Sequence, residues 1–140
     1  GLGDVYKRQK IICPRDVDFT KEEVQRLVRN AIIRAMKKVA GEYLPPLLDA
    51  LAEHYGLSYK RVKITGSKGR WGSCSAAGSI NLSCYLMLLP SHLMDYVLLH
   101  ELSHTKEMNH GPRFWELLDS MTEGRAHLLR AELRQFNTDF

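Results

Sequence analysis

The sequence has few cysteines and lacks the long apolar runs of a membrane-spanning protein. No apolar stretch in its 140 residues is long enough to cross a bilayer, and no signal peptide is visible. The three cysteines, Cys13, Cys74 and Cys84, form neither a C-x-x-C zinc pattern nor an even disulfide framework. These absences predict a protein without a membrane partner, in a reduced, cytoplasmic compartment.

The rest of the composition is ordinary for a folded domain, with 44% hydrophobic and 26% charged residues. A chain of this length suits one domain with one core. We assign residues 10–140 to that domain. Residues 1–9, GLGDVYKRQ, read as a cloning or sequence-assembly artefact or a disordered leader unrelated to the domain. Residues 10–13 read as a stub of strand that Pro14 ends.

The net charge of +4 is spread unevenly along the chain. Residues 1–40 carry ten Lys and Arg against five Asp and Glu, whereas residues 81–140 carry five against eight. A solvated basic helix face explains the N-terminal excess, and we prefer this explanation. The alternative is a surface for nucleic acid or another polyanion.

Apolar periodicity predicts helices in the first 56 residues. Residues 20–23, T-K-E-E, read as a capping box for a helix that runs to about Val39. Pro45-Pro46 predicts a break and a restart, and Gly56 predicts the end of a second helix near His54.

Two strands are predicted after these helices. Residues 59–65 and 79–82 alternate as half-buried strands do, and the glycines between them favour a small antiparallel meander. The predicted fold class is therefore α+β, with a small antiparallel sheet packed against helices. Between the strands lies K-G-R-W-G-S-C-S, residues 68–75, which reads either as a turn with a core tryptophan or as a cleft wall that aligns substrate.

The sequence H-E-L-S-H at residues 100–104 lies in a further helix, for which Ser91 is the predicted N-cap. Histidines four apart share one helix face, so His100 and His104 can reach one metal ion. Glu101 can then contact water on that metal. This is the H-E-x-x-H arrangement of zinc hydrolases, with two ligands and a carboxylate as general base. Tyr96, one turn before His100, shares its face.

A third metal ligand has two candidates. Asn109 and Gly111-Pro112 break the helix, so His110 falls where the chain turns and can swing back to the metal. Glu123 lies nineteen residues beyond His104, a spacing that suits a carboxylate from a following helix. We prefer His110, and the spacing leaves Glu123 open.

With these residues in place, the chain resembles the YgjP-like zinc metallopeptidases, relatives of the SprT-like and WLM groups. The resemblance covers roughly residues 19–120. It rests on separate motifs in the expected order, namely residues 70–75, Ile80, Leu82, Pro90, Asp95-Tyr96-Val97, residues 100–104, Asn109-His110 and Phe114-Trp115. Although the histidine spacing also matches the metzincins, Glu107 occupies the position where that motif needs glycine.

The resemblance implies a Zn²⁺ metallopeptidase of zincin-like fold, with His100, His104 and His110 as zinc ligands. It implies that Glu101 is catalytic, taking a proton from zinc-bound water and passing it to the leaving amine of a peptide or protein substrate. The segment around Trp71 is expected beside the cleft. The candidate substrate contacts are Arg70, Trp71, Ser73 and Tyr96.

Two other functions stay open. In a metal-dependent nucleoside triphosphate pyrophosphatase, Lys63, Lys68 and Arg70 would hold the phosphates, although no P-loop is present. In a nucleic-acid-associated protein, the zinc would be structural. Structural zinc sites normally use four protein ligands, and Cys74 is the one candidate for the fourth.

Overall fold

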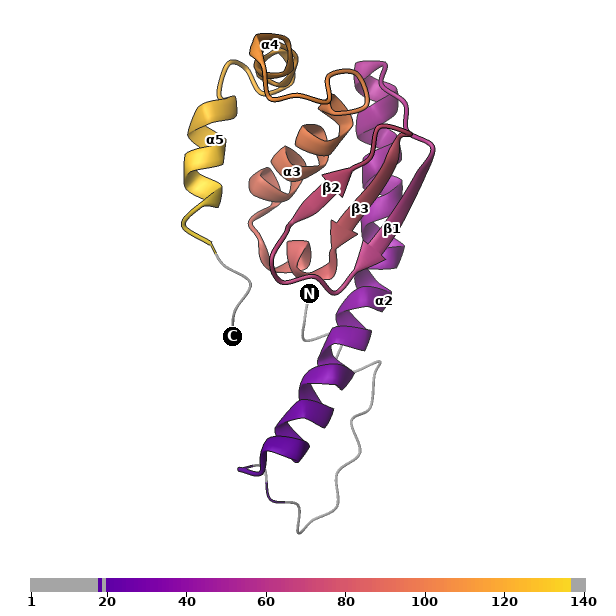
Figure 1. Ribbon diagram of the computed structural model, residues 1–140, viewed down its shortest axis with the longest axis vertical. Coiled ribbons are helices and arrows are strands. Elements are labelled where there is room, and N and C mark those ends of the chain that lie inside the picture. The colour runs from indigo at the N-terminus through magenta and orange to yellow at the C-terminus, as the bar shows by residue number, and fades with distance from the viewer. Residues whose placement is uncertain (1–17, 19, 137–140) are drawn as a thin grey trace.

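The computed structural model describes residues 18 and 20–136, and it has the α+β architecture that the sequence predicts (Figure 1). The elements follow in the order α2 (Glu22–Tyr55), β1 (Arg61–Thr65), β2 (Gly72–Cys74), β3 (Ser79–Ser83), the 3₁₀ helix η1 (Cys84–Leu88), α3 (Ser91–Ser103), α4 (Pro112–Met121) and α5 (Ala126–Leu133). The leader and the strand stub expected at residues 1–13 lie outside the described residues.

Helix α2 is one continuous helix, so the predicted restart at Pro45-Pro46 is wrong. Gly56 does end the helix, with φ at 68°. Two successive prolines remove two backbone donors from the helix. The chain nevertheless stays helical because Leu44 and Leu48 are both 0% exposed in the core, on either side of the prolines. Here tertiary packing outweighs the local cost.

The helix starts also differ from the predicted ones. No side chain caps α2, and the hydroxyl of Thr20 donates to the carboxylate of Asp18 at 2.6 Å instead. Hydrogen bonds from the hydroxyl and the backbone N–H of Thr20 lower the pKa of Asp18. At α3 the N-cap is Pro90, and Ser91 is already helical. The capping box and the Ser91 cap are thus both wrong.

The sheet is mixed, which corrects the predicted antiparallel meander. Its strand order is β1-β3-β2, with β3 parallel to β1 and antiparallel to β2. The reason is that residues 66–71 carry the chain past the end of β3 before β2 begins. The hydroxyl of Ser83 donates to the Ser67 carbonyl at 2.7 Å, and its N–H donates to the Trp71 carbonyl at 2.9 Å. These two bonds hold the crossing segment against the end of β3.

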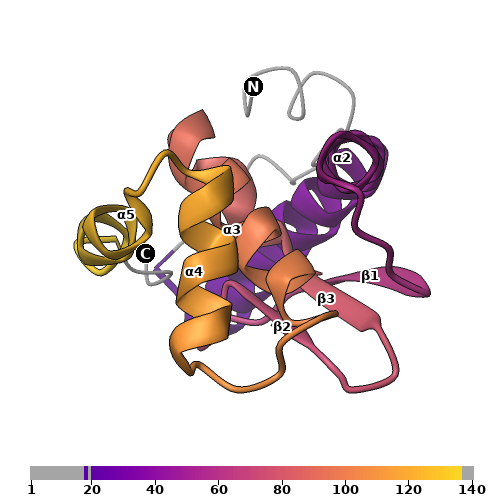
Figure 2. The same cartoon turned by 90° about the horizontal axis from the view of Figure 1, so that it is seen from above.

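The helices α2 and α3 cover one face of this sheet (Figure 2). Ile80 and Leu82 of β3 are buried in the core that these helices form, and Asn81 between them is exposed. Helix α3 is the central element, because it contacts α2, β2, β3, α4 and α5. Nine of its 13 residues are buried. None of the described helices combines the length and the apolarity needed to cross a membrane.

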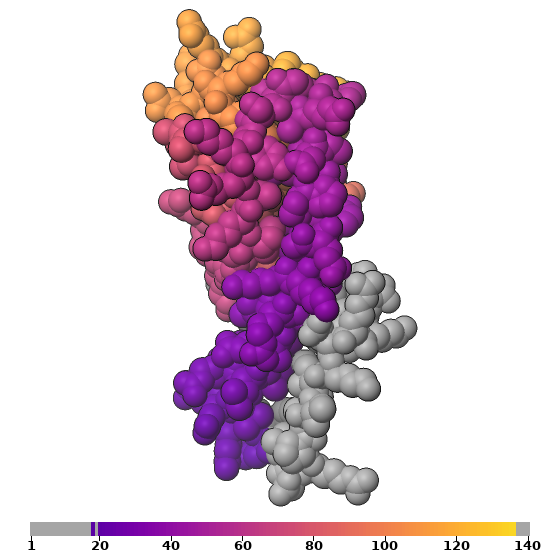
Figure 3. Space-filling model, turned by 90° about the vertical axis from the view of Figure 1, so that its right-hand side faces the viewer, coloured from indigo at the N-terminus to yellow at the C-terminus, as the bar shows by residue number. Residues whose placement is uncertain are grey.

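The first turns of α2 project beyond this packed body (Figure 3). The basic side chains of this helix, among them Arg26, Arg29, Lys37 and Lys38, are exposed. They form the solvated face that the sequence suggests, and Leu27 beside them is 61% exposed.

We expect the substitution Leu44→Ala to lower the free energy of unfolding by about 2–5 kcal/mol, because it leaves a cavity in the core beside the prolines. Leu27→Ala, on the exposed part of the same helix, is the matched control and should change it by less than about 1 kcal/mol. Urea denaturation followed by circular dichroism measures both. Equal effects at the two positions would contradict the packing described for α2.

Candidate metal centre

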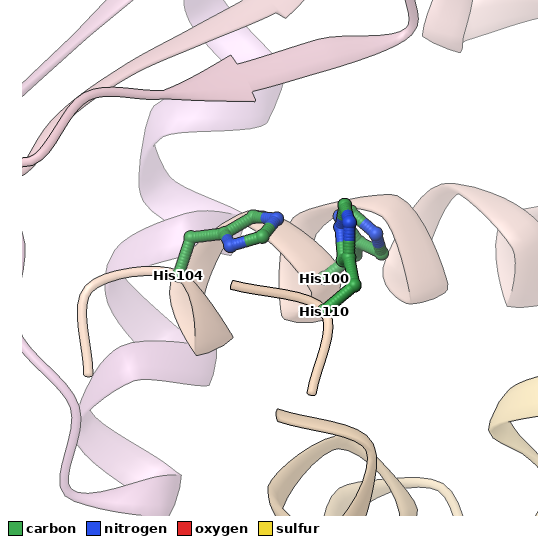
Figure 4. Close-up of side chains that lie close together, drawn as sticks. All are labelled: His100, His104 and His110. Carbon is green, nitrogen blue, oxygen red and sulfur yellow. The ribbon is translucent and has the colours of Figure 1, made fainter. Parts of the chain in front are cut away.

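Three imidazole rings meet on one side of α3 (Figure 4). His100 lies in α3, His104 is the residue at its C-terminal end, and His110 comes from the segment between α3 and α4. The ring centroids are 4.7 to 5.3 Å apart, and one nitrogen of each ring lies within 4.8 Å of the others. Among the described residues, no other group of three histidines, cysteines or carboxylates has the spacing of a metal site.

The backbone after α3 fixes the orientation of His104. Its Nδ1 lies 3.1 Å from the carbonyl oxygen of Glu107, in the turn that leads to His110. In the tautomer that donates Nδ1–H to this carbonyl, Nε2 keeps the lone pair that a metal ion needs. Pro112 then begins α4, as predicted, and directs the chain away from the site.

Phe114 packs against all three imidazole rings. It is fully buried, and its ring centroid lies 5.0, 4.6 and 4.8 Å from those of His100, His104 and His110. Sequence reasoning gave Phe114 a packing role and did not identify the histidines as its partners. The one sequence feature that could have indicated this contact is that Phe114 follows His110 by four residues.

The electrostatic surroundings favour neutral imidazole at His110. Partial burial lowers its pKa, and so do the nearby His104, His100 and Arg130. The neutral ring is the form that binds a metal ion.

Glu101 belongs to α3, and its side chain lies against Gly72 of β2. It is 5% exposed, and one carboxylate oxygen is 3.3 Å from Nδ1 of His100. A Cβ atom on Gly72 would lie 3.1 Å from Cγ and 3.2 Å from Oε2 of Glu101. Glycine at position 72 therefore allows β2 to approach the carboxylate. On the same strand, burial and then the charge of Glu101 raise the pKa of the Cys74 thiol to about 11.

A cleft of about 350 Å³ adjoins the metal centre, and His100 is the histidine that lines it. Its lining comes from three parts of the chain: α3, the segment that leads into β2, and α5 with the residues after it. The lining residues are Gly69, Arg70, Trp71, Gly72, Tyr96, Val97, His100, Glu101, Arg130, Leu133, Arg134 and Phe136.

Three of the four predicted substrate contacts line this cleft, namely Arg70, Trp71 and Tyr96. The hydroxyl of Tyr96 is buried without a hydrogen-bond partner among the described residues, and burial raises its pKa to about 12. Ser73 instead lines a neighbouring cavity of about 190 Å³ and accepts a hydrogen bond from Asn81 at 3.3 Å.

Most of the residues that the alternative hypotheses require do not join the three histidines or the cleft. Glu123 is exposed in the turn between α4 and α5, with φ at 55°, and is not in the metal-binding group. Cys74 is not in it either. Lys63 and Lys68 are exposed, and neither lines the cleft.

Sequence reasoning missed the side of the cleft that α5 provides. Arg130 and Arg134 both line it, and they are four residues apart at the end of this helix. Their spacing was visible in the sequence, but it did not indicate which part of the chain the helix faces.

A helix that carries H-E-x-x-H, with a third histidine and an adjoining cleft, defines a site of the metallopeptidase class. The chain belongs to the YgjP-like family, because the model of that family's metallopeptidase domain matches residues 4–136. This confirms the resemblance found in the motifs and shows that the protein is a hydrolase.

The fold is also similar to a solved structure, the metallopeptidase zymogen of Pyrococcus abyssi abylysin. The two share 25% sequence identity with a TM-score of 0.58, over 65% of this chain and 91% of the other. A search of curated proteins finds no match.

The choice of third ligand is open to a direct test. We expect His110→Ala to weaken zinc binding at least about 100-fold, because it removes one of three ligands. Glu123→Ala should leave the affinity unchanged. Competition with a chromogenic chelator measures both affinities. Full zinc affinity without His110, or its loss without Glu123, would refute this ligand set.

Proposed function

We propose that this protein is a zinc-dependent peptidase in which His100, His104 and His110 hold the zinc ion and Glu101 is the general base. The observation that supports this most strongly is the group of three imidazoles beside a cleft that one of them, His100, lines together with the buried carboxylate of Glu101. When bound there, zinc supplies Lewis acidity towards a water molecule and a peptide carbonyl group.

The donor set fits zinc in both chemistry and span. Imidazole nitrogen is a preferred zinc ligand, with bonds of about 2.0–2.1 Å, so two ligand atoms can be at most about 4.2 Å apart. The ligand atoms of the three histidines lie within 4.8 Å of one another, and small side-chain rotations bring them into that range.

The number of ligands favours a catalytic site over a structural one. Structural zinc sites are closed by four protein ligands, whereas catalytic sites keep one position open. No fourth histidine, cysteine or carboxylate of residues 18 and 20–136 joins the three histidines. This also weighs against a nucleic-acid-associated protein with a structural zinc.

Glu101 is placed to move the proton. Its buried carboxylate, next to His100, accepts a proton from the attacking water and then delivers it to the leaving amine nitrogen. Val97, one turn earlier on the same helix, is buried and lines the same cleft, so it limits the access of other water to the carboxylate.

The cleft wall that precedes β2 positions the substrate. Trp71 offers an aromatic surface and Arg70 a guanidinium group, and both line the cleft together with Glu101. A peptide that lies along this wall would present a carbonyl group near His100, which lines the same cleft. We assign Arg70, Trp71 and Tyr96 to substrate contact.

We expect Glu101→Gln to retain zinc and to lose at least about 100-fold in kcat, because the amide cannot accept the proton. Hydrolysis of casein or a quenched fluorescent peptide measures the activity, and metal analysis measures the zinc content. Glu116→Gln, on the exposed surface of α4, is the matched control and should keep full activity. Full turnover in Glu101→Gln would contradict the assignment of Glu101 as the general base.

Gly72→Ala tests the packing behind Glu101. The added methyl group would push the carboxylate out of place, so kcat should fall about ten- to a hundredfold with zinc still bound. The same measurements apply. Gly41→Ala, where a Cβ meets nothing within 4 Å, is the control and should keep wild-type activity. Unchanged kcat in Gly72→Ala would show that the position of Glu101 does not depend on this contact.

A further inference from the structure

The cleft wall formed by α5 and by the segment before β2 is rich in positive charge. Arg130 in α5 and Arg134 at its C-terminal end are four residues apart, so they share one face of this helix. Arg70 comes from the segment before β2 and lines the same cleft. Two separate parts of the chain thus direct arginines to one cavity.

Within the described part of the chain, these arginines have no ion-pair partner. Among residues 18 and 20–136, no carboxylate lies within ion-pair distance of Arg70, Arg130 or Arg134. Arg130 is held in place by another contact, because its guanidinium carbon lies 5.6 Å from the centre of the Trp115 ring. A guanidinium fixed in this way loses little entropy when it binds an anion.

The remaining lining is largely apolar, and it includes Trp71, Val97, Leu133 and Phe136. Tyr96 adds a buried hydroxyl group that has no partner among the described residues. Such a lining suits a ligand with an aliphatic part and one anionic end, since the first packs on apolar side chains and the second pairs with arginine.

We propose that Arg70, Arg130 and Arg134 form a subsite for a carboxylate group of the peptide substrate, close to the bond that is cleaved. This rests on the proposed peptidase function, and it names the substrate class. A carboxylate suits the subsite better than a triphosphate does. Glu101 lines the same cleft, and its negative charge repels a triphosphate more strongly than it repels a single carboxylate.

Paired peptides test the subsite in the zinc-loaded enzyme. One set carries Glu or Gln at each position around the cleavage site, and a second set ends in a free carboxylate or an amide. We expect the carboxylate form to have about tenfold higher kcat/KM, which is the effect of about 1.4 kcal/mol. If the Glu and Gln peptides differ, the subsite binds the carboxylate of an acidic side chain. If the peptides with a free or an amidated end differ, it binds the C-terminal carboxylate of the substrate.

Substitutions of single arginines test whether the subsite causes the preference for a carboxylate. Arg134→Gln should reduce the tenfold ratio to about one, because it removes the charge and keeps a polar side chain. Arg125→Gln, at the exposed start of α5 and outside the cleft, should keep both the ratio and the activity. A ratio of one in the wild-type enzyme, or a tenfold ratio that survives Arg134→Gln, would overturn the subsite.

Binding to metal-free protein separates this inference from the proposed function. Fluorescence anisotropy of labelled Glu and Gln peptides should show the same preference without any cleavage. Peptides that are cleaved without a preference would overturn the subsite and leave the peptidase standing. Binding that prefers the carboxylate, with no peptide cleaved by the zinc-loaded enzyme, would overturn the peptidase. Arg134-dependent hydrolysis of nucleoside triphosphates, without any peptide preference, would overturn both.

Discussion

The burial of α3 is the constraint on which the rest of the structure depends. This helix contacts α2, the sheet, α4 and α5, and burial of each of its large apolar side chains stabilises the fold by about 1.5–3 kcal/mol. Rotation about its own axis would expose several of these side chains at once. The core therefore fixes the side of α3 from which His100 projects.

Much of this site could be predicted because its signals are local in the sequence. The four-residue spacing of the first two histidines needs only a helix. The helix ends at Ser103, however, which is earlier than the break predicted at residues 109–112. The structure brings the side chain of His110 to this pair, while Glu123 stays away. The predicted strands also exist, because alternation along a strand is a local pattern.

The features that could not be predicted depend on contacts between distant residues. The prolines of α2 carry a strong local signal for a break, and only the core against Leu44 and Leu48 overrides it. Strand order in the sheet depends on the path of residues 66–71, which no periodicity records. Arg130 and Arg134 look like ordinary surface charges until the packing of α5 is known, so the basic part of the cleft was not recognised in the sequence.

The modest packing of α5 has a consequence for how the cleft can move. This helix has two buried residues, Ala126 and Leu129, whereas α3 has nine. Local unfolding requires the least free energy where few apolar side chains become exposed. The local free energy of unfolding should therefore be lower for α5 than for α3. Backbone amides of α5 should exchange with solvent before those of α3. One wall of the cleft can thus open locally while α3, which carries His100 and Glu101 on another wall, stays folded.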